Sequence, residues 1–323
     1  MNSKERVLTA LNLGKPDRIP FMEWYYDYEI GEGILGRDDY QREEIAEALC
    51  MDGIGTYVGP EACAEKLISS EGRRFEGRGL LASHKDLKMI QLPNPRDSSL
   101  YDNVKKTLDE YGERFFIFTG MNSGADLLLR GMGLENFSYA LHDNIKLIED
   151  IIDIYSDWAA EAVCELQKTG IDAIWFADDI AFATSLMFSP DFFREVIKPR
   201  MKKVIDNVKL PVIYHSDGNL TPIISDLIEL GIKALHPIEP TALDIEEVKA
   251  KWGDKLCLIG NIDLGHTLVY GTAKEVEEEV KSRIEKVGYN GGYILASANS
   301  LTDYCRTENI LAMRDTLLKY GTL

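Results

Sequence analysis

Short apolar runs that end in polar or turn residues recur along the chain. Most of them are continuous rather than alternating, which is typical of parallel strands that are covered on both faces. The run "LPVIYHSDG" shows the pattern, since its apolar stretch stops abruptly at a histidine and an aspartate. Eight such runs occur, at residues 18–24, 53–60, 114–122, 171–179, 210–218, 232–240, 255–263 and 291–300.

Segments between these runs carry the spacing of amphipathic helices. Residues 145–166 place apolar side chains at helical intervals. The stretch "SPDFFREVIKPRMKKVIDNV" begins with Ser189, which is suited to cap a helix. The stretch "TAKEVEEEVKSRIEKVG" begins with Thr272 and Glu275, which have the spacing of a capping box. The alternation of strands and helices predicts parallel βαβ units.

Eight such units in 323 residues predict an α/β fold, a (β/α)8 TIM barrel that forms a single domain over residues 1–323. Residues 1–17 are expected to form a leading helix. Residues 60–110 are too long for one crossover and predict an insertion after strand two, with a hairpin around "EGRRFEGRGLL" (71–81). An open doubly wound sheet is the alternative, but the GxGxxG fingerprint is absent after the first strand.

Composition and charge narrow the class of protein. Apolar residues make up 45% of the chain and charged residues 28%, which is enough for a substantial core. The chain has no long apolar span and no apolar leader segment, and its five cysteines form no CxxC pair, so a cytoplasmic protein with reduced thiols is expected. The net charge of −18 argues against nucleic acid or an anionic membrane as the main partner.

Polar residues end nearly every apolar run. In a barrel enzyme the catalytic groups lie at the C-terminal ends of the strands, so these residues are expected to converge on one mouth. The candidates are Glu23, Asn122, Ser123, Asp178, Asp179, His215, Asp217, His236, Glu239, Asn261, Asp263, Ser297 and Asn299.

Two chemistries agree with these residue types. His215 and Asp217 lie two positions apart at a strand end, so their side chains point to the same side. Neutral imidazole with carboxylate or amide oxygens suits zinc or a harder divalent ion. Metal-free acid–base catalysis by His215 and a buried aspartate is the other interpretation, and spacing alone does not separate the two.

Several longer stretches, in their order and spacing, resemble the uroporphyrinogen decarboxylase superfamily, and especially its corrinoid-linked methyltransferase branch. The stretches are "ERVLTALNLGKPDRIPF", "GIDAIWFADDIAF", "SPDFFREVIKPRMKKVI", "PVIYHSDGNLTPIISDLIELGIKAL", "IGNIDLGHTLVYGTAKEVEEEV" and "GGYILASANSLTDYCRTENILAM". The resemblance implies a (β/α)8 barrel with its site at the strand C-termini. True decarboxylases of the family carry an arginine-rich segment after the first strand, whereas this chain has "PFMEWYYDYEI" without arginine.

The resemblance also implies a set of metal ligands. Thiol-methylating members of the branch bind zinc through His-x-Cys after strand five and a cysteine after strand eight. The matching positions here are His215, Asp217 and Asn299, so that oxygen ligands replace both cysteines. Such a site would hold a harder and more Lewis-acidic metal, which suits removal of a methyl group from an ether or amine.

The expected function is therefore methyl transfer from a small methylated substrate, of the methoxyaromatic or methylamine type, to a corrinoid carried by a separate protein. Glu23, Asp179, His215 and Asp217 are predicted to be catalytic, with zinc bound by His215, Asp217 and Asn299. The residues predicted to bind substrate are Trp24, Tyr25, Asn122, Asp178, His236 and Asn299.

Two alternatives stay open at this point. The first is a decarboxylase of uroporphyrinogen or a smaller cyclic acid, for which Arg130 in "LLLRGMG" is the available cation. The second is a non-catalytic binding protein on an enzyme-like barrel, because fold alone does not establish chemistry. The sequence does not fix the oligomeric state, and a homodimer is one of the assemblies it allows.

Overall fold

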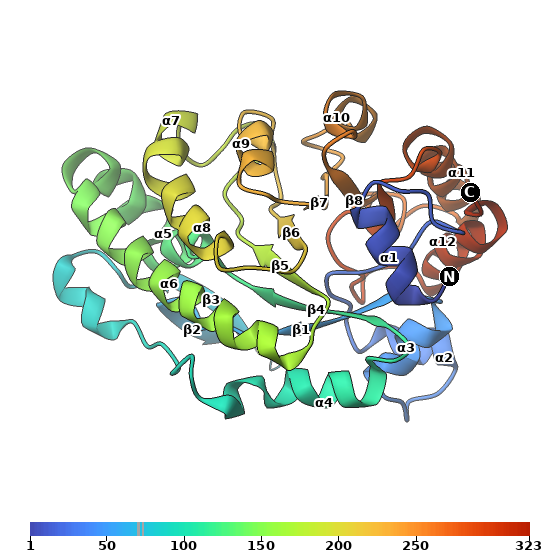
Figure 1. The fold of residues 1–323 in the computed structure, drawn as a ribbon, viewed down its shortest axis with the longest axis horizontal. Helices are drawn as coiled ribbons and strands as arrows, with labels where there is room; N and C mark the ends of the chain where they lie inside the picture. Colours follow the sequence, from blue (N-terminus) through green and yellow to red (C-terminus); the bar gives the residue numbers. More distant parts are fainter. Residues whose placement is uncertain (70–71, 73) are drawn as a thin grey trace.

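The centre of the molecule is a seven-stranded parallel sheet, seen in a computed structural model that describes residues 1–69, 72 and 74–323 (Figure 1). Neighbouring strands are paired in the order β1-β4-β5-β6-β7-β8-β9, each pair parallel. The strands are β1 (Gly53–Tyr57), β4 (Phe116–Met121), β5 (Ala173–Ala177), β6 (Val212–His215), β7 (Ala234–His236), β8 (Cys257–Ile262) and β9 (Tyr293–Ser297).

The predicted first strand, residues 18–24, forms no strand. Phe21 makes one isolated parallel bridge with Leu295 of β9, and the Phe21 carbonyl accepts a hydrogen bond of 2.7 Å from the Asp52 N–H, just before β1. Pro20 has no N–H group, so the ladder with β9 cannot continue toward the N-terminus. The sheet therefore has seven strands where eight were predicted, with an irregular segment beside β9 and the start of β1.

Helices follow the strands and pack on the outside of the sheet (Figure 1). The predicted helix at residues 145–166 is confirmed as α6, and the predicted caps at Ser189 and Thr272 are present. The helices are α1 (Ser3–Leu11), α2 (Ile30–Leu35), α3 (Arg42–Ala48), α4 (Asp102–Tyr111), α5 (Ala125–Asp143), α6 (Ile145–Leu166), α7 (Pro190–Phe192), α8 (Lys198–Ile205), α9 (Ile224–Glu229), α10 (Ile245–Trp252), α11 (Ala273–Arg283) and α12 (Thr307–Tyr320). Each helix in the described chain is too short or too polar to cross a bilayer.

The segment between β1 and β4 contains an antiparallel pair, β2 (Ala64–Ile68) and β3 (Arg74–Gly79). Residues 70, 71 and 73 of the predicted hairpin lie outside the described residues. The pair packs directly against α5, because a side chain at Gly79 would lie only 2.4 Å from the Gly133 nitrogen and the Leu81 N–H donates to the Gly131 carbonyl. This contact places β3 beside the functional cavity.

From β4 to β9 both faces of the sheet are buried, which explains why these strands are continuous apolar runs. One core cluster fills the inner face and includes Phe118, Trp175 and Ile259, together with Val7 and Leu11 of α1. A larger cluster lies between the outer face and the helices. The leading helix thus closes the N-terminal end of the sheet, and the opposite end is left for the site.

Candidate functional site at the C-terminal ends of the strands

A cavity of about 460 Å³ lies at the C-terminal ends of the strands. Five of the predicted site residues line it, and they come from the irregular first segment, from β6, and from the loops after β4, β5 and β9. These five residues are Trp24, Asn122, Asp179, His215 and Asn299.

His215 ends β6 and is 4% exposed. Its Nε2 atom lies 3.5 Å from Asp179 Oδ1, and its ring stacks on Trp24 with a centroid distance of 5.8 Å and an interplanar angle of 13°. Its Nδ1 atom lies 2.7 Å from Nδ1 of His236. The ring is thus fixed on three sides, with Nε2 directed toward Asp179.

His236, predicted to bind substrate, is fully buried beneath His215 and is not among the described residues that line the cavity. Burial, and then the neighbouring His215, hold the pKa of His236 well below its usual 6.5, so it is a neutral imidazole. Its ring meets Trp175 edge-on, and its Nε2 atom has no hydrogen-bond partner among the described residues. His236 therefore supports His215 from behind rather than lining the cavity itself.

Asp179 and Asp217 lie beside His215. The Asp217 N–H donates to Asp179 Oδ1 at 2.9 Å, and Asp217 Oδ2 accepts a hydrogen bond of 2.8 Å from Asn299 Nδ2. No described residue forms a hydrogen bond with Asp217 Oδ1, although this atom is buried. Burial raises the pKa of Asp217 to about 6, and the opposing effect of His215 is smaller.

Asp179, His215 and Asp217 each offer one ligand atom, and these atoms lie within 4.8 Å of one another. The set predicted from the sequence was His215, Asp217 and Asn299. The structure places Asp179 beside His215 and Asp217, while Asn299 donates a hydrogen bond from its amide nitrogen to Asp217. The predicted role of Asn299 as a metal ligand stays a prediction.

Asp178, also predicted to bind substrate, lies away from the cavity. Asp178 and Asp179 follow the end of β5, and their carboxylates bond to different groups, that of Asp178 to the start of α5 and that of Asp179 to the Asp217 N–H. The Asp178 carboxylate is fully buried and accepts hydrogen bonds from the N–H groups of Ser123 and Asp126, at the start of α5. Burial raises its pKa, and these hydrogen bonds oppose the rise. Asp178 thereby fixes the start of α5.

Glu23 and Tyr25 are likewise absent from the described residues that line this cavity. The Glu23 carboxyl group is 2% exposed and accepts hydrogen bonds from the Ser297 N–H at 2.8 Å and the Ser297 hydroxyl at 2.7 Å. Burial raises its pKa to about 8. Tyr25 is half exposed and lies under the Arg42 guanidinium, 4.5 Å from ring centre to Cζ. Their predicted roles stay predictions.

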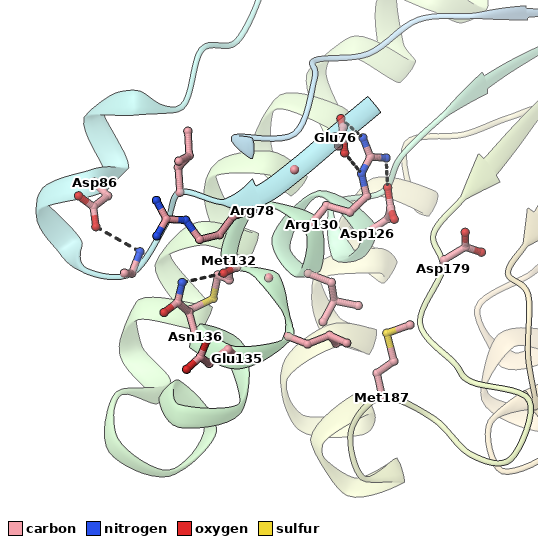
Figure 2. Close-up of a pocket in the computed structure, with 17 residues that line it drawn as sticks. Glu76, Arg78, Asp86, Asp126, Arg130, Met132, Glu135, Asn136, Asp179 and Met187 are labelled. Atoms are coloured by element: carbon pink, nitrogen blue, oxygen red, sulfur yellow. Dashed lines mark hydrogen bonds and ion pairs between the residues drawn. The ribbon is translucent and has the colours of Figure 1, made fainter. Parts of the chain in front are cut away.

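The sequence indicated Arg130 as an available cation, but sequence reasoning missed its two carboxylate partners at the edge of the cavity (Figure 2). Arg130 of α5 donates to Glu76 of β3 at 2.6 and 2.7 Å and to Asp126 at 2.7 Å. Burial raises the pKa of Asp126 to about 7, against the opposing effect of Arg130. Asp126 lies in the first turn of α5, four residues after Asn122, and no local pattern marks Glu76.

Comparison with known proteins identifies the family. The family model described as uroporphyrinogen decarboxylase (URO-D) matches residues 66–320, so the chain belongs to the URO-D family. It is 27% identical over 222 residues to a methylcobamide:CoM methyltransferase MtaA of Methanosarcina barkeri, covering 69% of this chain and 63% of that protein. It is also 27% identical to a uroporphyrinogen decarboxylase of Chlorobium luteolum, covering 64% of this chain and 60% of that protein. The matched region thus spans less than two thirds of either relative.

Among solved structures, a methyltransferase from Methanosarcina mazei has a similar fold. The TM-score is 0.78 at 20% sequence identity, and the alignment covers 99% of each chain. At this identity the likeness supports the fold. It agrees with the α/β architecture and extends over the whole chain.

Proposed function

We propose that this protein is a methyltransferase that moves a methyl group from a small methylated molecule, of the methoxyaromatic or methylamine type, to a corrinoid carried by a separate protein. The observation that carries the proposal is the group of Asp179, His215 and Asp217 at a cavity with an aromatic wall. The similarity to MtaA supports corrinoid-linked methyl transfer, because that relative is named a methylcobamide:CoM methyltransferase, and the transfer proposed here runs in the reverse direction, toward the corrinoid.

The residues present fit a zinc ion. A buried carboxylate oxygen without a hydrogen-bond donor, such as Asp217 Oδ1, is costly unless a cation satisfies it. His236 can accept a hydrogen bond from His215 Nδ1, which leaves the Nε2 lone pair of His215 as a metal ligand. Asp179, His215 and Asp217 would hold the ion, and Asn299 would orient Asp217. Zinc bound by one imidazole and two carboxylates supplies Lewis acidity toward the heteroatom of the methyl donor.

The side chains of the cavity orient the donor. Trp24 is fixed between His215 and Phe118, with ring centroids 5.8 and 6.4 Å away, and offers a rigid aromatic face. Tyr57 lines the same cavity and donates its hydroxyl hydrogen bond to Asn122. A planar or apolar methylated molecule packs favourably on such a wall.

The departing group needs a proton when the donor is a methyl ether. As the methyl group leaves for cobalt(I), the carbon–oxygen bond breaks and its electron pair stays on oxygen. Asp126 is suited to supply the proton, because it lines the cavity and burial raises its pKa to about 7.

Decarboxylation of uroporphyrinogen or a smaller cyclic acid is less well supported by the cavity. Its two cationic lining residues, Lys66 and Arg130, are both engaged by carboxylates. A substrate with several carboxylates would compete with Glu76 and Asp126 for Arg130 and would meet Asp179 beside it.

The corrinoid would approach from the open side of the cavity. The net charge of −18 predicts that the partner protein presents a basic surface to this chain. Complementary charge of this kind speeds association and makes it sensitive to salt.

The first test mixes the purified protein with cob(I)alamin and a panel of 2-methoxyphenol, 4-methoxyphenol, methylamine and trimethylamine. We expect at least one donor to convert cob(I)alamin to methylcobalamin, followed by its visible absorbance. No conversion with any donor, while iodomethane methylates the same cob(I)alamin, would contradict the proposed activity.

The metal assignment has its own measurement, which is zinc content after dialysis. His215→Ala and Asp217→Ala should each lower bound zinc at least tenfold, because each removes a ligand. Asp206→Ala, at an exposed aspartate on the outer surface, is the matched control and should retain wild-type zinc. Equal zinc in all three variants would dismiss the ligand assignment.

A further inference from the structure

A second, larger cavity of about 940 Å³ lies beside the first (Figure 2). We call it the outer chamber; its walls come from β3, from α5 and from the loop after β5. It shares four lining residues with the first cavity, namely Glu76, Asp126, Arg130 and Asp179. The two spaces therefore meet at the ion-pair group of Arg130 and next to one of the candidate zinc ligands.

Apolar side chains of α5 and of the loop after β5 form part of the wall of the outer chamber, beside polar and charged ones such as Arg78, Asp126 and Glu135. Leu129 and Met132 are almost completely buried, Leu134 is half exposed, and Met187 lies on the other side of the chamber. Figure 2 shows Met132 and Met187 on different walls, with Arg130 between its two carboxylates at one end. Apolar surface beside fixed polar groups is common in small-molecule sites, and these four apolar side chains supply such a surface here.

The local backbone forms this shape. Gly133 has a φ of +70° and breaks the helical conformation of α5 within the chamber wall. Gly79 lets β3 approach this break, since a side chain there would collide with the backbone at Met132 and Gly133. These two glycines therefore allow the hairpin to pack closely against α5, and the hairpin and α5 form two walls of the chamber.

We infer that the outer chamber binds the apolar body of an extended aryl substrate, of two rings or similar size, whose methylated end lies in the first cavity. The assignment of the reacting end rests on the proposed function. Arg130 lies where the two spaces meet, and carboxylates on two sides fix its planar guanidinium. A guanidinium held in this way stacks well with an aromatic ring, which suits the middle of such a substrate.

The test compares two methyl ethers that differ by one ring, 4-methoxyphenol and 4-(4-methoxyphenyl)phenol, by calorimetric titration into the full chain without corrinoid. Burial of the second ring should tighten binding about tenfold or more. Leu134→Trp should fill the outer chamber and reduce this advantage to less than about threefold, while binding of 4-methoxyphenol stays within about twofold of wild type.

Leu318→Trp on α12 is the matched control, because Leu318 and Leu134 are exposed to 46% and 51%. It should leave the advantage of the two-ring ether unchanged. Met187→Trp, which fills the chamber from another wall, is the second variant if Leu134→Trp does not fold. Equal affinity of wild type for both ethers, or an advantage that survives both filling variants, would overturn the inference.

The outcome is separable from that of the proposed function. The titration contains no cobalt, so a chamber that selects the two-ring ether stands even where cob(I)alamin is never methylated. Conversely, methylation of cobalt without tighter binding of the two-ring ether would support the proposed activity and contradict the inference about the outer chamber.

Discussion

Glu23 allows a direct test of how burial controls the ionisation of a carboxyl group in this protein. Its carboxyl group is almost fully buried and bonds only to the amide and hydroxyl of Ser297 among the described residues. Replacing it with glutamine keeps the shape and can satisfy both contacts, because the amide oxygen accepts from the Ser297 N–H and the amide nitrogen donates to the hydroxyl. Glu23→Gln thus removes the ionisable proton and little else.

The sign of the pH dependence follows from the pKa of Glu23, which burial raises from 4.5 to about 8. Between these pH values the folded state keeps a proton that the unfolded state has released, so the free energy of unfolding falls as the pH rises. Since each pKa unit is worth about 1.4 kcal/mol, the full effect is roughly 5 kcal/mol, of which about 3–4 kcal/mol falls between pH 5 and pH 8. Glu23→Gln lacks this contribution, and its stability relative to wild type should rise by that amount.

The assay is urea unfolding of wild type and Glu23→Gln at half-unit steps from pH 5 to pH 8, followed by circular dichroism. Glu113→Gln, at an exposed glutamate, is the control and should follow the wild-type curve within about 0.5 kcal/mol. Parallel pH curves for wild type and Glu23→Gln would refute the reasoning, because the carboxyl group would then ionise equally in both states.

Two further predictions concern the support of the sheet and of His215. Asp52 is fully buried and forms ion pairs with Arg6 and Arg18 near the N-terminal end of the sheet. Asp52→Asn should therefore lower the free energy of unfolding, measured by urea titration, by about 3 kcal/mol. A loss below about 1 kcal/mol would contradict this prediction. His236→Phe keeps an aromatic ring but removes the hydrogen-bond acceptor for His215 Nδ1. The zinc affinity, measured in competition with a chromogenic chelator, should fall 10–100-fold. An unchanged affinity would show that this hydrogen bond does not support zinc binding.

Much of the fold was predictable because residues that pack in the core are apolar, and this pattern is visible in the sequence. Strands that are buried on both faces must be apolar throughout, so seven of the runs correspond to strands. The run at 18–24 satisfied the same apolar criterion, but Pro20 lacks the N–H that a ladder needs, and the segment makes only one bridge. Apolar pattern alone therefore overestimates the number of paired strands.

The site was predictable to the extent that it depends on strand ends. Asp179, His215 and Asn299 come from different strand ends and do line one cavity, as expected from parallel strands. The sequence could not show that Glu76 would join them, because it belongs to the segment between β1 and β4, whose position depends on the contact of Gly79 with α5. Long-range packing of this kind leaves no periodic pattern.

The pairing of His215 with His236 connects the sequence to the chemistry most directly. Both histidines end apolar runs, in adjacent strands, and the register of β6 with β7 places them as direct partners. Partners in a parallel pair project to the same face, so their rings must meet there, and the 2.7 Å contact between the Nδ1 atoms requires one ring to donate and the other to accept. Because His236 is buried and neutral, donation from His215 leaves the Nε2 atom free to act as acceptor toward Asp179 and Asp217. Strand register therefore brings the two rings together, and the tautomer in which His215 donates leaves its Nε2 atom as an acceptor facing Asp179.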